Sequence, residues 1–223
     1  MKVVRVIGFG EMDKQVPDRR VFCIGRNYAD HAKELANEIP ARPVIFMKPA
    51  TSLVWPGTDV CFPAHGDDLQ HEVELVVEIG RDGKPEASGD ASSFIRSYSV
   101  GIDLTLRDVQ KEMKAGCLPW EIAKAFDQSA LIGDLVPCQS LDALSALSFS
   151  CSVNGELRQS GHSGAMIFPV DQLLVAISKV WTLRQGDLVY TGTPSGVGPL
   201  RIGDIVAVSC ASVGVFEWKI VAA

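Results

Sequence analysis

The chain alternates short apolar runs with polar turns, and most runs have the composition of β-strands. We predict strands where apolar and β-branched residues cluster between turn-forming residues. They fall at residues 3–9, 21–24, 44–47, 71–79, 98–104, 188–191, 205–210 and 215–221. Residues 149–153 and 156–159 flank Asn154-Gly155, the preferred pair of a type I′ turn, and are predicted to form a hairpin.

Three segments instead follow the helical period. Residues 27–37 predict a helix capped by Asn27 or Asp30, and residues 169–180 place apolar side chains at 170, 173, 174, 177 and 180. After the strand at 98–104, Thr105 and Asp108 predict a helix start and Gly116 its end. Strands outnumber helices and do not alternate with them regularly. We therefore predict an α+β, mostly-β roll with a few peripheral helices.

Composition narrows the class of protein. The chain has 223 residues, of which 47% are hydrophobic and 22% charged, as in ordinary globular proteins. We expect a single domain over residues 1–223, with 1–20 a short N-terminal strand segment.

No stretch reaches the roughly 18 apolar residues of a membrane span. A net charge of −6 argues against nucleic acid as a partner. Scattered cysteines and the absence of an apolar leader favour a cytoplasmic protein.

The first candidate site is a group of carboxylates on two strands. Glu72 and Glu74 are two residues apart, which places both on one face of a strand. Two like charges side by side are costly unless protons or a cation neutralise them. Asp103 ends an apolar strand, where burial of a carboxylate also demands a partner. A hard divalent ion fits these oxygens. The alternatives are a solvated strand face that includes Glu78, and a helix-capping role for Asp103.

The second candidate is a histidine with a carboxylate. His31 and Glu34 are three residues apart, which puts them on one face of a helix. A carboxylate beside an imidazole fixes its tautomer and raises its basicity, as activation of water requires. An incidental surface pair is the alternative.

Two weaker features follow. Lys124 has apolar neighbours, so its ammonium either faces a buried anion or extends along the surface to solvent. Arg107 and Gln110 share a helix face near Asp103. The glycine-rich segment 191–199 follows a strand and offers backbone N–H groups and hydroxyls to a carboxylate. It lacks the spacing of a nucleotide-binding loop, and a tight turn at a sheet edge is the alternative.

Taken together, these segments resemble the fumarylacetoacetate hydrolase family, and most closely its compact acylpyruvate hydrolases. The matching strings keep the family's order from about residue 21 to 200. They are FCIGRNYADHAKEL, PVIFMKPATSL, HEVELVVEIG, GIDLTLRDVQ, PWEIAKAFD, VNGELRQSG and GDLVYTGTPSGVGP.

The resemblance implies a β-roll, a homodimer and specific roles for the candidate residues. Glu72, Glu74 and Asp103 match metal ligands for Mg²⁺, with Mn²⁺ as an alternative. His31 and Glu34 match a water-activating dyad, and Lys124 matches a residue that stabilises developing charge. Substrate contacts are implied for Gln110 and Thr193, and more weakly for Arg26 and Arg107. The segments 36–42 and 114–118 are expected to shape the far end of the pocket.

The implied activity is metal-dependent hydrolysis of a C–C bond in a 3-acylpyruvate, such as fumarylpyruvate or acetylpyruvate. The products would be pyruvate and a carboxylic acid. The same site suits decarboxylation or keto–enol tautomerisation of oxaloacetate, since both pass through a metal-held enolate. A catalytically silent protein that binds a metal or a small acid is the alternative from a different class.

Overall fold

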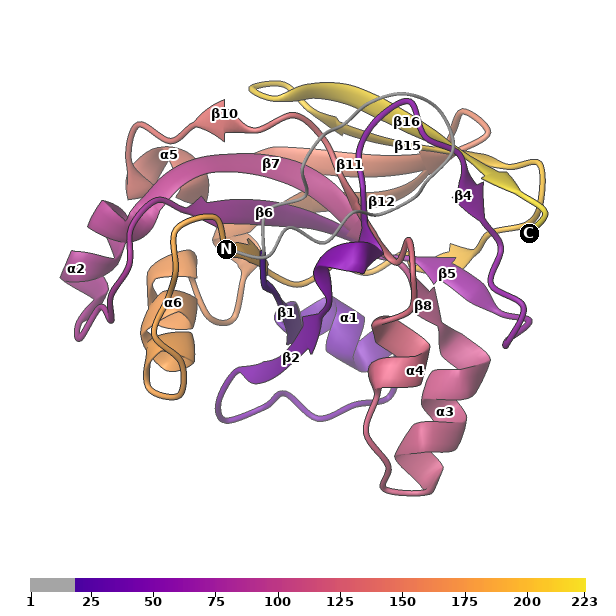
Figure 1. Cartoon of the computed structure of the whole chain (residues 1–223), viewed down its shortest axis with the longest axis horizontal. Coiled ribbons are helices and arrows are strands. Elements are labelled where there is room, and N and C mark those ends of the chain that lie inside the picture. Colours follow the sequence, from indigo (N-terminus) through magenta and orange to yellow (C-terminus); the bar gives the residue numbers. More distant parts are fainter. Residues whose placement is uncertain (1–18) are drawn as a thin grey trace.

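The computed structural model describes residues 19–223, and strands dominate it (Figure 1). The strands are β1 Val21–Gly25, β2 Val44–Lys48, β3 Leu53–Val54, β4 Val60–Cys61, β5 Leu69–His71, β6 Val73–Ile79, β7 Ile95–Asp103, β8 Thr105–Leu106, β9 Ala130–Ile132, β10 Val136–Pro137, β11 Ser148–Val153, β12 Glu156–His162, β13 Leu188–Tyr190, β14 Gly198–Pro199, β15 Ile205–Cys210 and β16 Gly214–Val221. The α-helices are α1 Ala29–Glu34, α2 Ser88–Ala91, α3 Arg107–Ala115, α4 Glu121–Lys124, α5 Leu141–Ser145 and α6 Val170–Ser178. Short 3₁₀ turns span Ala50–Ser52, Ser92–Phe94 and Ser163–Ala165. The strand predicted at 3–9 lies outside the described residues, and a single domain over 1–223 stays a prediction.

The described strands form three sheets of mixed pairing. The eight-stranded sheet has the order β2-β1-β13-β6-β7-β9-β3, with β10 paired to β7. The second sheet has the order β12-β11-β15-β16-β4, and the third has β14-β5-β8. β6 and β7 are antiparallel, whereas β1 runs parallel to β13. This confirms the mostly-β α+β class.

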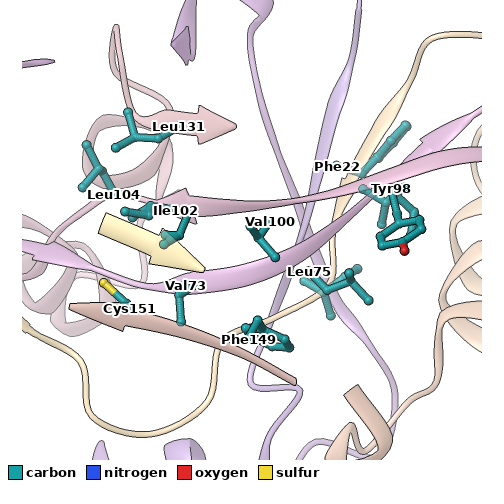
Figure 2. Packing of buried hydrophobic residues seen from close by; sticks show 14 of the residues in the cluster. Phe22, Val73, Leu75, Tyr98, Val100, Ile102, Leu104, Leu131, Phe149 and Cys151 are labelled. Carbon is teal, nitrogen blue, oxygen red and sulfur yellow. The ribbon is translucent and has the colours of Figure 1, made fainter. Parts of the chain in front are cut away.

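The main core lies between the two larger sheets. Figure 2 shows the side chains of Val73 and Leu75, from β6, together with Phe149, from β11, in the same apolar cluster. Every position of β6 is buried, including its glutamates. The alternation of apolar and polar side chains along β6 therefore does not separate a buried face from a solvent-exposed one. It separates the face in the core from a second face that is also buried.

Local signals located several elements well. In the β11–β12 hairpin, Asn154 has φ 53° and Gly155 has φ 81°, as a type I′ turn requires. Gly116 lies at the C-terminal cap of α3, as predicted. In α6 the predicted apolar positions are buried except Val180, which lies beyond the helix end and is 63% exposed.

Two of the three predicted helix starts were wrong. α1 begins after Tyr28 and α3 after Leu106, and neither cap residue offers a side-chain hydrogen bond. Asp108 instead accepts a hydrogen bond from the Asp67 backbone N–H over 2.7 Å. Thr105 belongs to β8. A contact distant in sequence therefore occupies the Asp108 carboxylate, whereas the Thr105 hydroxyl donates to the nearby Asp103 carbonyl over 3.3 Å.

The strand predicted at 71–79 is also interrupted. β5 ends at His71 and β6 begins at Val73, so Glu72 lies between strands of two different sheets. This break places the Glu72 carboxylate where the sheets diverge.

The helices gather in two places. α3 and α4 pack together beside β8, whereas α2 and α6 pack together elsewhere in the molecule (Figure 1). No helix within residues 19–223 has both the length and the apolar character that crossing a membrane requires.

Candidate metal centre and substrate pocket

The carboxylates of Glu72, Glu74 and Asp103 converge at the ends of β6 and β7. Antiparallel pairing aligns Val73 with Ile102, and the Asp103 N–H donates to the Glu72 carbonyl over 2.8 Å. One oxygen from each carboxylate lies within 4.8 Å of the others. All three are at least 95% buried, at 5%, 1% and 1% exposure. The alternative of a solvated strand face was wrong.

Glu78, the additional member of that alternative, takes no part in the cluster. It is buried, accepts a hydrogen bond from the Ser97 hydroxyl and lies 3.4 Å from an Arg19 nitrogen. Its role is that of a structural ion pair.

Three basic side chains surround the acidic cluster. Lys124 Nζ lies 2.7 Å from Glu72 Oε2 and 2.7 Å from Asp103 Oδ2. Lys48 Nζ lies 2.8 Å from Asp103 Oδ1, and the Arg107 guanidinium pairs with Glu72. The alternative of an extended surface Lys124 was therefore wrong, because its side chain is 4% exposed.

Lys48 was missed at the sequence level. The sequence feature that identified Asp103 also applies to Lys48, which is a charged residue at the end of an apolar strand, β2. The residue is 2% exposed.

The charges in the cluster are unevenly compensated. Burial favours a neutral Glu72, but Lys124 and Arg107 outweigh it and hold the Glu72 pKa well below its usual range. Burial likewise opposes charge on Lys124, yet Asp103 and Glu72 raise its pKa. Burial together with the neighbouring Asp103 and Glu72 charges raises the Glu74 pKa well above its ordinary value. Glu74 therefore needs a proton or an additional cation.

These donors fit a hard divalent ion. Asp103 Oδ1 is buried and accepts no hydrogen bond from residues 19–223, although Lys48 Nζ lies 2.8 Å away. Glu74 Oε2 accepts one bond, from the Gly192 N–H over 2.6 Å. Carboxylate oxygens from three positions are the ligands that Mg²⁺ and Mn²⁺ prefer.

His31 and Glu34 meet on α1, as predicted. His31 Nδ1 lies 3.2 Å from Glu34 Oε2, and the Gly196 N–H donates to Glu34 Oε1 over 2.9 Å. An ionised Glu34 requires the proton on Nδ1, which leaves Nε2 with its lone pair. Burial lowers the His31 pKa despite the nearby Glu72 and Glu34. The imidazole is thus neutral at pH 7 and is suited to accept a proton.

The loop after β13 differs from the prediction. Its backbone N–H groups were expected to be available to a substrate carboxylate. Two of them, from Gly192 and Gly196, donate to the protein's own Glu74 and Glu34. The loop therefore positions both carboxylates, and Thr193 is the member that lines the pocket.

Gln159 of β12 is a second residue that sequence reasoning missed. Its Nε2 donates to Thr193 Oγ1 over 2.8 Å, and its Oε1 lies 2.8 Å from His71 Nδ1. Thr193 accepts this bond, and its hydroxyl donates to the Pro194 carbonyl over 3.4 Å. The matching string VNGELRQSG contains Gln159, but nothing local distinguished it.

One cavity joins these groups. Its volume is about 30 Å³, room for an ion with one or two waters, so a larger ligand has to displace lining side chains. Every predicted site residue lines it except Glu34, which contacts His31. Arg107 also donates to Gln110 Oε1 over 2.7 Å. Asn37 and Lys114, from the two segments expected to shape the far end, line the cavity too, as does Trp120.

Comparisons with known proteins agree with this geometry. The family model for the fumarylacetoacetate hydrolase C-terminal domain matches residues 20–221. A mitochondrial oxaloacetate tautomerase of Mus musculus is 39% identical over 202 residues, 91% of each chain. A mitochondrial oxaloacetate decarboxylase of Dictyostelium discoideum is 41% identical over 189 residues, 84% of this chain and 87% of the relative. A solved fumarylpyruvate hydrolase from Pseudomonas aeruginosa, in complex with Mn²⁺ and pyruvate, has a TM-score of 0.88 and 36% identity. That match covers 95% of this chain and 93% of the other.

Proposed function

Because the chain belongs to the fumarylacetoacetate hydrolase family, we propose that it catalyses enolate chemistry on oxaloacetate, as a keto–enol tautomerase or a decarboxylase. The observation that carries the proposal is the buried acidic cluster enclosed by Lys48, Lys124 and Arg107 and faced by a neutral histidine. The names of the two oxaloacetate-acting relatives support this substrate over an acylpyruvate.

Charge supports a small anionic substrate. The three carboxylates of the acidic cluster and the three basic side chains around it have a net charge of −3 + 3 = 0. A bound divalent ion therefore brings this group of charges to about +2. Oxaloacetate carries two negative charges at pH 7 and complements that excess. Glu72, Glu74 and Asp103 would hold the ion, Mg²⁺ or Mn²⁺, and the ion would supply Lewis-acid stabilisation of an enolate oxygen.

The protein's own groups account for the proton movements. In tautomerisation, His31 Nε2 would accept the proton from C3, and the imidazolium would return that proton to the carbonyl oxygen as the enol forms. Glu34 keeps the imidazole in the required tautomer. In decarboxylation, the C3–C4 bond breaks, C4 leaves as CO₂, and the electron pair of the bond gives the enolate of pyruvate, which takes a proton from solvent at C3. Lys124 lies where negative charge develops and stabilises it.

Hydrolysis of an acylpyruvate is the second candidate. It was the main expectation from the sequence. The His31–Glu34 pair favours it, because an oriented neutral imidazole accepts a proton from water. The fumarylpyruvate hydrolase of similar fold supports it as well.

A parallel turnover assay separates these candidates. Chelator-treated protein is assayed with and without Mg²⁺ on oxaloacetate, acetylpyruvate and fumarylpyruvate. For oxaloacetate, both pyruvate release and enol–keto interconversion are followed. We expect oxaloacetate to have the highest Mg²⁺-dependent kcat/KM. A clear preference for an acylpyruvate would establish the second candidate instead, and no turnover would favour the silent binding protein.

His31→Ala distinguishes the two oxaloacetate reactions. We expect tautomerisation and any hydrolysis to fall about 100-fold or more, the typical contribution of a general base. Decarboxylation needs no base to start and should fall less. Metal binding of the variant is measured in parallel. Tautomerisation within a few-fold of the wild-type rate would contradict the base role.

Two further expectations remain proposals. We propose a homodimer, to be measured by sedimentation. We also propose a cytoplasmic location, although the two oxaloacetate-acting relatives are named as mitochondrial.

A further inference from the structure

Two of the four basic side chains that line the cavity lack a counter-charge. Lys124 and Arg107 line it and pair with carboxylates of the acidic cluster, as Lys48 does from outside the lining. Lys114 and Arg26 line it too, but neither has an ion-pair partner within residues 19–223. A positive charge that is partly desolvated and unpaired is costly unless a ligand supplies the anion.

Both side chains are held in place by the fold. Arg26 lies between β1 and α1 with φ 59°, a backbone conformation that non-glycine residues adopt only when their surroundings impose it. Its Nε is buried and has no hydrogen-bond partner in the described part of the chain. Lys114 lies in the last turn of α3, and its Nζ lies 5.3 Å from the centre of the Trp120 ring.

The electrostatics of Lys114 confirm an excess of positive charge at this end of the cavity. Burial, together with the charges of Arg26 and Arg107, lowers its pKa to about 8. A bound carboxylate would reverse that shift, because an opposite charge favours the protonated amine.

We propose that Lys114 and Arg26 form a second carboxylate subsite, which selects substrates whose far end is itself a carboxylate. The inference rests on the proposed function, in which the 2-oxo-carboxylate end is held over the acidic cluster. It names the class as a short 2-oxo dicarboxylate. A substrate that ends in a neutral ketone, such as acetylpyruvate, would leave both cations desolvated and unpaired.

Equilibrium binding tests the subsite without turnover. (S)-Malate and (S)-lactate share a 2-hydroxy-carboxylate end, and only malate has the second carboxylate. Dissociation constants are measured by calorimetry with Mg²⁺-saturated protein. We expect the wild type to prefer malate by about 10-fold or more, the value of one charge-assisted hydrogen bond. Lys114→Met should reduce that preference to about 2-fold or less and leave lactate binding unchanged.

Lys111→Met is the matched control. It removes the same charge from the exposed surface of the same helix and should keep the malate preference. Lys114→Arg should restore most of it, and thermal unfolding confirms that each variant folds.

Three results would overturn the subsite. They are a wild type without malate preference, a Lys114→Met variant that keeps it, and a variant that weakens both ligands equally. Absence of oxaloacetate turnover would instead refute the proposed function while leaving the malate preference intact. The two failures are therefore distinguishable.

Discussion

At the level of single residues, Glu74 has the least compensated charge in the site. Glu72 and Asp103 contact basic side chains, whereas Glu74 has one hydrogen bond, from a backbone N–H. Its raised pKa, caused by burial and by those two carboxylates, gives it a proton over a wider pH range than an exposed glutamate. An arriving metal ion must displace that proton.

We therefore expect Mg²⁺ binding to release a proton and to tighten as the pH rises. Above its ordinary pKa of 4.5, the folded state binds a proton that the unfolded state has lost. Metal-free protein should consequently lose stability as the pH rises through the folded pKa, and Mg²⁺ should restore it. Calorimetry in buffers of different ionisation enthalpy measures the released proton.

Glu74→Gln is the corresponding variant. It should weaken Mg²⁺ binding at least about 10-fold, since loss of an outer partner of a ligand already costs that much. It should also abolish the proton release. Glu78→Gln, on the same strand but outside the cluster, should keep both. Unchanged proton release in Glu74→Gln would assign the proton to another group.

At the level of elements, short-range signals succeeded where the chain reverses on itself. The Asn154-Gly155 turn was located from two residues, because few other pairs tolerate positive φ at both positions. The N-terminal caps of α1 and α3 were not located from the sequence, because a side chain that can cap a helix can equally form hydrogen bonds elsewhere.

Gly155→Ala tests the turn. No atom lies within 4 Å of an added Cβ, so the cost is that of the left-handed backbone alone. We expect a loss of about 1 kcal/mol in the free energy of unfolding, measured by urea denaturation. Gly89→Ala is the control. It also has open space, but it lies in α2 with an ordinary φ. Its stability should be unchanged or raised by about 0.5 kcal/mol, and equal losses in both variants would refute the turn argument.

At the level of the whole molecule, one buried amide joins three separated segments. Asn27 Nδ2 donates to the carbonyls of Phe168 and Thr191 over 3.0 Å and 2.8 Å. Its Oδ1 accepts from the Phe168 N–H over 2.8 Å. The segment that carries Arg26 and the loop that carries Thr193 thus depend on the same side chain.

Asn27→Ala should therefore reduce stability and activity together. It leaves buried backbone groups without partners, at about 1–3 kcal/mol each, so we expect at least about 3 kcal/mol in chemical denaturation. Asn27→Asp keeps the acceptor but sets a carboxylate oxygen against the Phe168 and Thr191 carbonyls, so it should lose at least as much. Full activity in a destabilised Asn27→Ala would show that the two segments hold their positions independently.

The sequence by itself determined the strand-rich class, the hairpin, the family and ten candidate site residues, nine of which line the pocket. Those signals are local: periodicity, turn chemistry, charges that interrupt apolar strands, and the strings that match the family. Tertiary structure alone decided which charges pair. Lys48, Gln159 and Lys114 enter the site from three different elements. The register of β6 against β7 and the break at Glu72 set the distances between carboxylates. These depend on contacts between residues far apart in the chain, and a single sequence does not encode them in any local pattern.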